Sequence, residues 1–173
     1  MEMRLRFYGD PALREKAERV TTFDEQLHEI IEEMATLMYK EDGAGLAGQQ
    51  VGLKKRIFIE DDGSGSGWKA YINPEISHFS EEKEVGEEGC LSVPDIFENV
   101  ERSKTIKVTY QTVDGAVHKE EVSGYLARII QHETDHLNGI LFIDRISKIK
   151  KRLLKKKLDI IKEKAKEVYM NAG

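Results

Sequence analysis

The stretch at residues 131–139, QHETDHLNG, constrains the fold of this chain more than any other. At 3.6 residues per turn, His132 and His136 lie about 40° apart around a helix and roughly 6 Å apart along its axis. Both imidazoles can therefore reach one metal ion, while the carboxylate of Glu133 lies beside that ion and can take a proton from an activated water. The spacing predicts a helix that carries a metal site and a base.

The alternative is a helix that carries two histidines and a glutamate by coincidence. In a chain of 173 residues with five histidines, a chance H-E-x-x-H match is expected roughly one or two times in a hundred. A third metal ligand elsewhere in the chain decides between the two interpretations.

Length and composition predict one domain with a C-terminal extension, residues 1–147 and 148–173, the extension having no separate fold. Charged residues make up 34% of the chain, which predicts a heavily solvated surface. No run approaches 18 apolar residues, and the N-terminus lacks the apolar core of a signal sequence. We therefore expect a cytoplasmic protein without membrane contact. The lone Cys90 excludes an intrachain disulfide and fits a reducing compartment.

The net charge of −5 hides an asymmetry between the body and the tail. Residues 148–167 hold ten Lys and Arg against three Asp and Glu, and the rest of the chain holds 17 against 29. The predicted tail is an amphipathic helix with lysines on its outer face.

Hydrophobic periodicity and turn residues predict the remaining elements. The helical segments are PALREKAER after Asp10, an amphipathic helix that begins at a Thr22–Glu25 capping box and ends near Lys40, a helix that begins at Ser123 and ends at Asn138–Gly139, and one long helix from Ile146 to Val168. The strands are 56–60 with 68–72 and 104–111 with 117–122, each pair a hairpin, and an acidic surface segment covers 81–88. These elements predict an α+β fold, with antiparallel sheets and hairpins around a central metal-binding helix, an N-terminal helix and a long C-terminal helix.

Residues 43–52, GAGLAGQQVG, are glycine-rich and show no helical or strand period. The segment lacks the Lys-Ser/Thr of a phosphate-binding loop, so a loop whose backbone passes close to another ligand is favoured. Either Gln49 or Gln50 could polarise a carbonyl group, although a solvent-facing glutamine is the commoner case.

Cys90 lies in a turn-like stretch before the hairpin that leads into the histidine helix. A thiolate and two imidazoles make a sound ligand set for a first-row divalent ion and leave a fourth position open. Structural zinc normally takes four protein ligands, so an open, catalytic site is favoured. An inert buried thiol is the alternative for an isolated cysteine.

Three ordered stretches, GAGLAGQQ at 43–50, EGCLS at 88–92 and QHETDH at 131–136, resemble the signature motifs of the peptide deformylases. Further similarity, in FYGDPALR, INPEI and HLNGILFIDRIS, extends the resemblance to about residue 150. The family usually has alanine and proline where this chain has Gly48 and Gln49. That departure predicts a more flexible loop.

The resemblance implies that Cys90, His132 and His136 bind the metal and that Glu133 is the general acid/base. It further implies that Gln50 and the backbone N–H of Leu91 form the oxyanion hole. The implied reaction removes the formyl group of N-formylmethionyl nascent peptides through attack by a metal-activated hydroxide, releasing formate.

The resemblance also implies a substrate site. Gly45 would hydrogen-bond an extended peptide as a strand edge does, and the methionine side chain would enter a pocket near Tyr125, Arg128, Ile129 and His132. We expect the charge of Arg128 to point to solvent along the rim.

The metal implied by the resemblance is Fe²⁺. One cysteine and two histidines also accept Zn²⁺, Ni²⁺ or Co²⁺.

Two other functions compete with this one. A zinc endopeptidase of the H-E-x-x-H type would usually take its third ligand downstream of the helix, whereas Cys90 lies upstream. A nucleic-acid-binding module with a structural metal would use the basic tail, but the acidic body argues against broad nucleic-acid affinity. Within the favoured function, the tail is expected to dock the enzyme on the ribosome near the exit, through contacts with polyanionic RNA.

Overall fold

The structure is a computed structural model that describes residues 2–172. Its strands are β1 (Gly45–Ala47), β2 (Ile57–Glu60), β3 (Lys69–Phe79), β4 (Lys83–Cys90), β5 (Val93–Ser103), β6 (Thr105–Gln111) and β7 (Val117–Ser123). Its helices are α1 (Glu25–Lys40), α2 (Gly124–Leu137), α3 (Lys148–Leu153) and α4 (Lys155–Ala172), with 3-10 turns η1 (Pro11–Arg14), η2 (Gly48–Val51) and η3 (Phe142–Asp144). Among the described residues, no helix is both long and apolar enough to cross a membrane.

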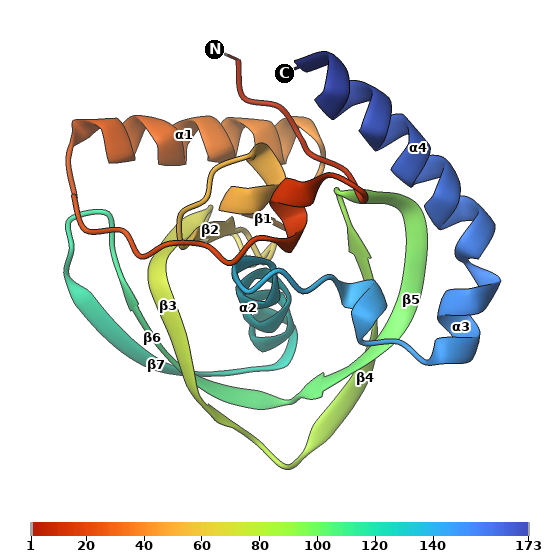
Figure 1. Cartoon of the computed structure of the whole chain (residues 1–173). Helices are drawn as coiled ribbons and strands as arrows, with labels where there is room; N and C mark the ends of the chain where they lie inside the picture. The colour runs from red at the N-terminus through yellow and green to blue at the C-terminus, as the bar shows by residue number, and fades with distance from the viewer. Residues whose placement is uncertain (1, 173) are drawn as a thin grey trace.

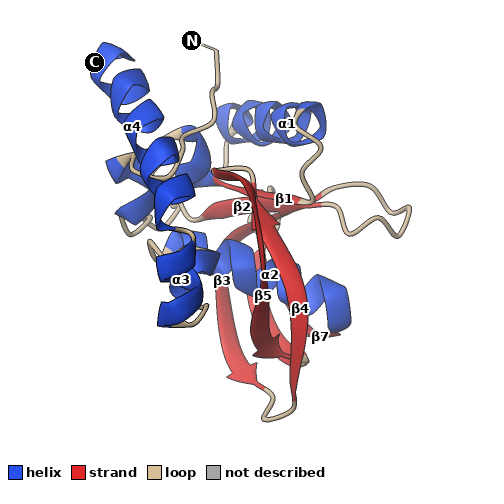
Figure 2. Cartoon of the chain, turned by 90° about the vertical axis from the view of Figure 1, so that its right-hand side faces the viewer, coloured by secondary structure: helices blue, strands red, loops and turns tan. Residues whose placement is uncertain are grey.

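Two antiparallel sheets surround one helix. The larger sheet has the strand order β1-β2-β3-β6-β7, and β4 and β5 form a separate two-stranded sheet. Helix α2 lies between them at the centre of the molecule, and the N-terminal segment passes between α1 and α4 (Figure 1, Figure 2). The predicted α+β fold, with antiparallel sheets around the helix that carries His132 and His136, is confirmed, as are both predicted hairpins.

Helix α1 buries one face and ends at Lys40, as predicted. The predicted Thr22–Glu25 capping box is wrong. Asp24 is the N-cap, and its side chain accepts a hydrogen bond from the N–H of Leu27 at 3.0 Å, because a carboxylate two residues nearer the helix satisfies the same free donors. The predicted helix PALREKAER is likewise reduced to the single turn η1, since Glu15 is already extended.

The glycine-rich segment forms a short strand and a 3-10 turn rather than an irregular loop. Gly45 pairs with Glu60 at the start of β1, and η2 follows directly. A Cβ at Gly48 would lie only 2.7 Å from the carbonyl oxygen of Lys55. The missing side chain thus lets two backbone segments meet at this point, while the predicted greater flexibility of the segment stays a prediction.

The predicted single C-terminal helix is broken at Leu154, where α3 ends and α4 begins (Figure 1). The predicted stripe packs on the body mainly through Leu158, Ile161 and Ala165 of α4, with Ile146 and Leu154 partly buried against the same core. Ile149 and Leu153 on α3 are 71% and 80% exposed, because the break reorients the helix axis and turns their face to solvent.

Candidate metal centre

Helix α2 holds both histidines on its buried side. The ring centroids of His132 and His136 lie 5.1 Å apart. Asn138 ends the helix and Gly139 follows with a φ of +76°, as predicted. Ser123 takes the predicted N-cap position, but its hydroxyl pairs with Thr105 Oγ1 at 2.8 Å and caps no backbone N–H.

Cys90 completes a three-ligand cluster with these histidines. Its Sγ lies 3.4 Å from His136 Nε2, and the ligand atoms of all three residues lie within 4.8 Å of one another. Burial lowers the pKa of His136 well below its usual value, so the ring is neutral and its nitrogen lone pair is free. A thiol and two imidazoles at mutual reach form the donor set that first-row divalent ions prefer.

Strand β4 and its tight turn into β5 position the cysteine. Cys90 is the last residue of β4 and pairs with Val93, rather than lying in the expected irregular turn. The N–H of Tyr8 donates to the carbonyl of Ser92 at 2.8 Å, which fixes the turn from the N-terminal side. Leu91 in that turn lines the same cavity as Gln50.

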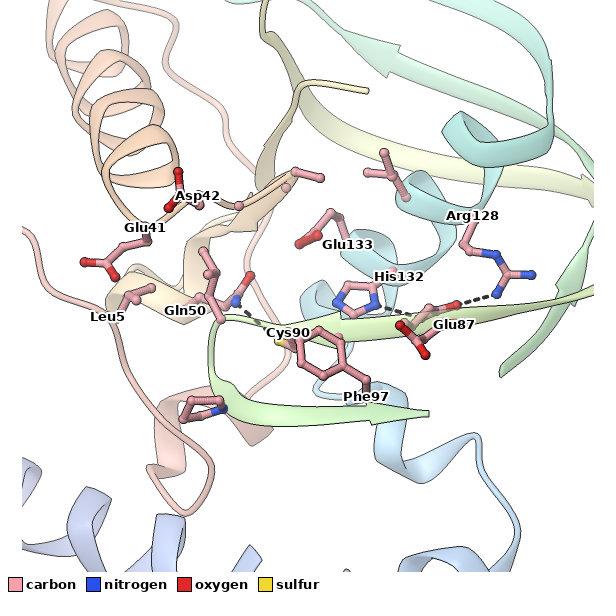
Figure 3. Close-up of a pocket in the computed structure, with 18 of the residues that line it drawn as sticks. Leu5, Glu41, Asp42, Gln50, Glu87, Cys90, Phe97, Arg128, His132 and Glu133 are labelled. Atoms are coloured by element: carbon pink, nitrogen blue, oxygen red, sulfur yellow. Dashed lines mark hydrogen bonds and ion pairs between the residues drawn. The ribbon is translucent and has the colours of Figure 1, made fainter. Parts of the chain in front are cut away.

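Gln50 is oriented toward the cluster. Its Oε1 accepts the N–H of Ala47 at 3.0 Å, so its amide nitrogen points the other way, 3.1 Å from Ser92 Oγ and 3.5 Å from Cys90 Sγ (Figure 3). Gln49 instead donates to the carbonyl of Glu15 at 3.1 Å. Of the two candidate glutamines, the structure brings only Gln50 to the cluster.

Glu133 is a buried carboxylate beside the metal ligands, with 4% exposure. Its Oε1 has no hydrogen-bond partner within residues 2–172. Burial raises its pKa to about 7, against the lowering effect of His132. A Cβ at Gly45 would lie 2.5 Å from Glu133 Oε2, so glycine is what allows β1 to pass over the carboxylate. The group is poised to exchange a proton near neutral pH.

Glu88 is a site residue that the sequence analysis missed. Its Oε1 lies 2.8 Å from His132 Nδ1, and Arg102 donates to both carboxylate oxygens at 2.9 Å. Although burial raises the pKa of Glu88, the bonds from Arg102 and His132 hold it well below its usual range. Arg102 also contacts Asp135 at 2.7 Å. Glu88 thus fixes the ring of His132 and directs Nε2 to the cluster.

The two-residue period of a β-strand could have identified Glu88 from the sequence. Glu88 and Cys90 are two residues apart on β4, so their side chains share one face of the strand.

The expectation that Arg128 points to solvent is wrong. Its Nη1 donates to Glu88 Oε2 at 2.7 Å and to the carbonyl of Val100 at 2.8 Å, and its Nη2 donates to the carbonyl of Glu84 at 2.8 Å. A buried carboxylate and free strand carbonyls satisfy the guanidinium better than the rim would. Arg128 therefore ties α2 to the β4–β5 sheet.

The cluster opens into a cavity of about 490 Å³ (Figure 3). It is lined by all the predicted substrate-site residues, namely Gly45, Tyr125, Arg128 and Ile129. Ile129 is buried, whereas Tyr125 is 58% exposed and stands at the mouth. Ile129 therefore contributes a buried apolar surface to the cavity that the candidate ligands and Glu133 also line.

Comparison with known proteins gives a consistent result. The sequence model of the polypeptide deformylase family matches residues 3–152. The chain is 56% identical over 155 residues to a peptide deformylase of Thermotoga maritima, covering 90% of this chain and 93% of that protein. It is 42% identical over 170 residues to one of Fusobacterium nucleatum, covering 97% of each.

Solved structures agree. The crystal structure of the Thermotoga maritima peptide deformylase matches with a TM-score of 0.82 and 54% identity, covering 85% of this chain and 99% of that one. A peptide deformylase from Plasmodium falciparum matches with a TM-score of 0.90 and 36% identity, covering 95% and 98%.

Proposed function

The chain belongs to the polypeptide deformylase family and removes the formyl group from N-formylmethionyl peptides, and from that premise we propose how its own residues carry out the reaction. The observation that carries the proposal is the convergence of Cys90, His132 and His136 within 4.8 Å, next to a buried carboxylate.

Cys90, His132 and His136 would hold the metal ion. The site fits an ion because His132 Nδ1 is occupied by Glu88, which leaves Nε2 to ligate, and because His136 is buried and neutral. Three protein ligands converge among residues 2–172, so a position stays open, as in catalytic sites. When bound, the ion supplies Lewis-acid polarisation of the formyl carbonyl and lowers the pKa of water.

Glu133 acts as the general base and then as the general acid. Its Oε1 is free of protein partners among the described residues, and the residue lines the cavity together with Cys90 and His132. It accepts a proton from the water that attacks the formyl carbon and returns it to the leaving amine nitrogen, so that formate and a free N-terminus are released. A pKa of about 7 suits both transfers.

Gln50 and Leu91 stabilise the oxyanion that develops on the formyl oxygen. The amide nitrogen of Gln50 is held toward Cys90 by the bond from Ala47 to its oxygen. The backbone N–H of Leu91 is the second donor. Donors fixed before the reaction cost no reorganisation when charge develops.

Strand β1 receives the peptide. It is an edge strand of the larger sheet, so one side of Gly45 is free to pair with an extended chain. The methionine side chain then occupies the cavity near Ile129, with the stem of Arg128 and the ring of Tyr125 beside it. The charge of Arg128 meanwhile binds Glu88 and the carbonyl of Val100, so it does not point to solvent.

We propose Fe²⁺ as the native ion, and Zn²⁺, Ni²⁺ or Co²⁺ as substitutes. The resemblance and the mixed thiolate–imidazole donor set support it. The test is to purify the protein without oxygen, quantify each bound metal, and measure formate release from formyl-Met-Ala-Ser. An acetyl-capped peptide and an unblocked peptide serve as controls. Cleavage of an internal peptide bond would favour the endopeptidase, and zinc with full turnover would reject iron.

We further propose that the tail docks the enzyme on the ribosome, which places its work in the cytoplasm. Lys151 pairs with Asp144 and Lys155 with Asp159. Arg152 and Lys156 are exposed and form no ion pair within the described chain, so both are free to meet RNA phosphates.

The test is ribosome co-sedimentation of the R152E/K156E variant, with the exposed Lys107→Glu on β6 as control. Weaker binding of the double variant alone, with steep loss in salt, supports docking. Equal binding of all three proteins, or binding indifferent to salt, rejects it.

A further inference from the structure

A second cavity, of about 560 Å³, adjoins the first. The two share Phe7, Pro94 and Asp95, so the surface is continuous from the metal cluster outward. We call the second cavity the α4 groove, and its remaining lining residues come from helix α4: Lys157, Ile160, Ile161, Lys164 and Val168.

Close packing fixes the α4 wall of this groove. Leu158 and Ile161 share a core cluster with Val93 and Ile96 of the strand that follows the cysteine turn. On the same side, Gly9 has a φ of +104° and a Cβ there would lie 2.8 Å from Lys162 Cγ. The helix is therefore held against β5, the strand whose Val93 pairs with Cys90, and cannot shift without disturbing that strand.

The groove face of α4 still shows apolar side chains to solvent. Ile160 is 57% exposed and Val168 is 47% exposed. Both line the groove together with the two lysines. Exposed apolar side chains that are flanked by cations and continuous with a substrate cavity are typical of a ligand-binding surface.

A bulge in β5 forms the junction between the two cavities. Val93 pairs with Cys90 and Glu98 pairs with Glu88, so residues 94–97 oppose the single residue Gly89. Asp95 in this bulge has a φ of +64°, in the left-handed region that few side chains adopt. Bulges next to active sites redirect side chains, and this one presents Pro94 and Asp95 to both cavities.

We propose that the α4 groove binds the part of the formyl peptide that lies downstream of the methionine, with a large apolar side chain on Ile160 and Val168 and an acidic side chain beside Lys157 and Lys164. This inference rests on the proposed function. The occupant is the substrate itself, because the groove is continuous with its cavity and an extended chain advances about 3.3 Å per residue from one to the other.

The charges along the two cavities determine which peptide sequences bind best. The mouth of the first cavity carries carboxylates, including Glu41, Asp42 and Glu87. In the groove, neither Lys157 nor Lys164 forms an ion pair with any described residue. A peptide is therefore favoured when its acidic residue lies beyond the mouth and reaches the lysines.

The experiment compares formyl peptides of increasing length on the metal-loaded enzyme. Formyl-Met-Ala-Ser sets the baseline, and longer peptides carry a Leu-Glu pair that is moved one position at a time along an Ala/Ser background. We expect one placement to raise kcat/KM by about fivefold over the baseline, through KM and not kcat, because the groove contacts do not change as the formyl carbon reacts and such uniform binding lowers KM without raising kcat. With Leu-Lys at the same placement, kcat/KM should be about two- to fivefold lower than with Leu-Glu.

Variants assign that gain to the groove. Ile160→Ser should remove the gain, so that long and short peptides have equal kcat/KM. Lys164→Glu should invert the preference for the Leu-Glu peptide over the Leu-Lys peptide. Leu153→Ser on α3, 80% exposed, and Lys166→Glu on the opposite face of α4 are matched controls and should leave the ratio unchanged.

The outcomes separate this inference from the proposed function. No formate from the baseline peptide overturns the proposed function. Normal baseline turnover with no gain at any placement, or a gain that Ile160→Ser and Lys164→Glu leave intact, overturns the inference alone. Dimerisation in sedimentation experiments that Ile160→Ser abolishes would assign the groove to a second copy of the chain and overturn the inference as well.

Discussion

Glu88 Oε1 lies 2.8 Å from Nδ1 of His132, and this pair joins the metal cluster to a buried charge network. Arg102 bridges Glu88 and Asp135, and Arg145 adds a bond from Nη2 to Asp135 at 2.8 Å. The carboxylate holds the imidazole in the orientation that presents Nε2, so the ligand geometry is set outside the ligand shell.

Replacing Glu88 by glutamine should weaken metal affinity by about 10- to 100-fold, as is typical for partners that orient a ligating histidine. The amide loses the negative charge that both His132 and Arg102 contact. Metal affinity is measured by competition with a chelator of known strength. Glu87→Gln, at the exposed neighbouring position, is the control. Equal affinity in all three proteins would show that Glu88 does not support the site.

Glu133→Gln should keep the metal and lose turnover by about 10²- to 10⁴-fold, because the amide is close in shape but cannot accept a proton from water. Formate release and bound metal are measured on the same preparation. A rate within a few-fold of wild type, at equal metal content, would mean that another group is the base.

Gln50→Leu should lower kcat by about 10²- to 10³-fold with a smaller change in KM, as expected when one oxyanion donor is lost. The substitution also removes the acceptor of the Ala47 N–H, so the thermal midpoint is measured in parallel to separate folding from catalysis. An effect confined to KM would move Gln50 from catalysis to ground-state binding.

The buried carboxyl of Glu60 should make the free energy of unfolding depend on pH. It is 3% exposed, its Oε1 accepts from Tyr71 at 3.1 Å, and burial raises its pKa from 4.5 to about 7. Between these two values the folded state keeps a proton that the unfolded state has lost. The stabilising contribution of the neutral carboxyl is thus complete below about pH 4.5, falls as pH rises, and is gone above about pH 7.

Glu60→Gln, which stays neutral, should therefore gain stability relative to wild type between pH 5 and pH 8, by about 1–3 kcal/mol. The measurement is urea unfolding at both pH values, with the exposed Glu75→Gln as control. If the difference in unfolding free energy between wild type and variant is the same at both pH values, Glu60 is not the group that keeps the proton.

The sequence predicted the parts of the site that depend on periodicity. The i, i+4 spacing of His132 and His136 fixes their common face on any helix, and the confirmed ends of α1 and α2 follow from an amphipathic stripe and an Asn-Gly stop. The chemistry of a thiolate with two imidazoles suggested Cys90 as the third ligand, and the resemblance chose Gln50 over Gln49. The structure then brought Gln50 and Cys90 to 3.5 Å.

The failures share a physical cause, namely tertiary contacts that no local pattern encodes. Arg128 turns inward because it donates hydrogen bonds to Glu88 and to carbonyls of β4 and β5, and these acceptors lie 28 to 44 residues away in the chain. The break at Leu154 follows from how α4 docks, since a continuous stripe is equally compatible with one straight helix.

Chelation of the anaerobically purified protein tests the central claim most directly. Formate release from formyl-Met-Ala-Ser is followed as metal is withdrawn and restored, with circular dichroism recorded at each step, and the same titration is run on Cys90→Ser. The account predicts that turnover falls in proportion to bound metal, returns when Fe²⁺ is added back, and leaves the fold unchanged, while Cys90→Ser binds metal weakly and stays inactive. Full turnover in metal-free wild-type protein, or unchanged metal binding and activity in Cys90→Ser, would contradict it.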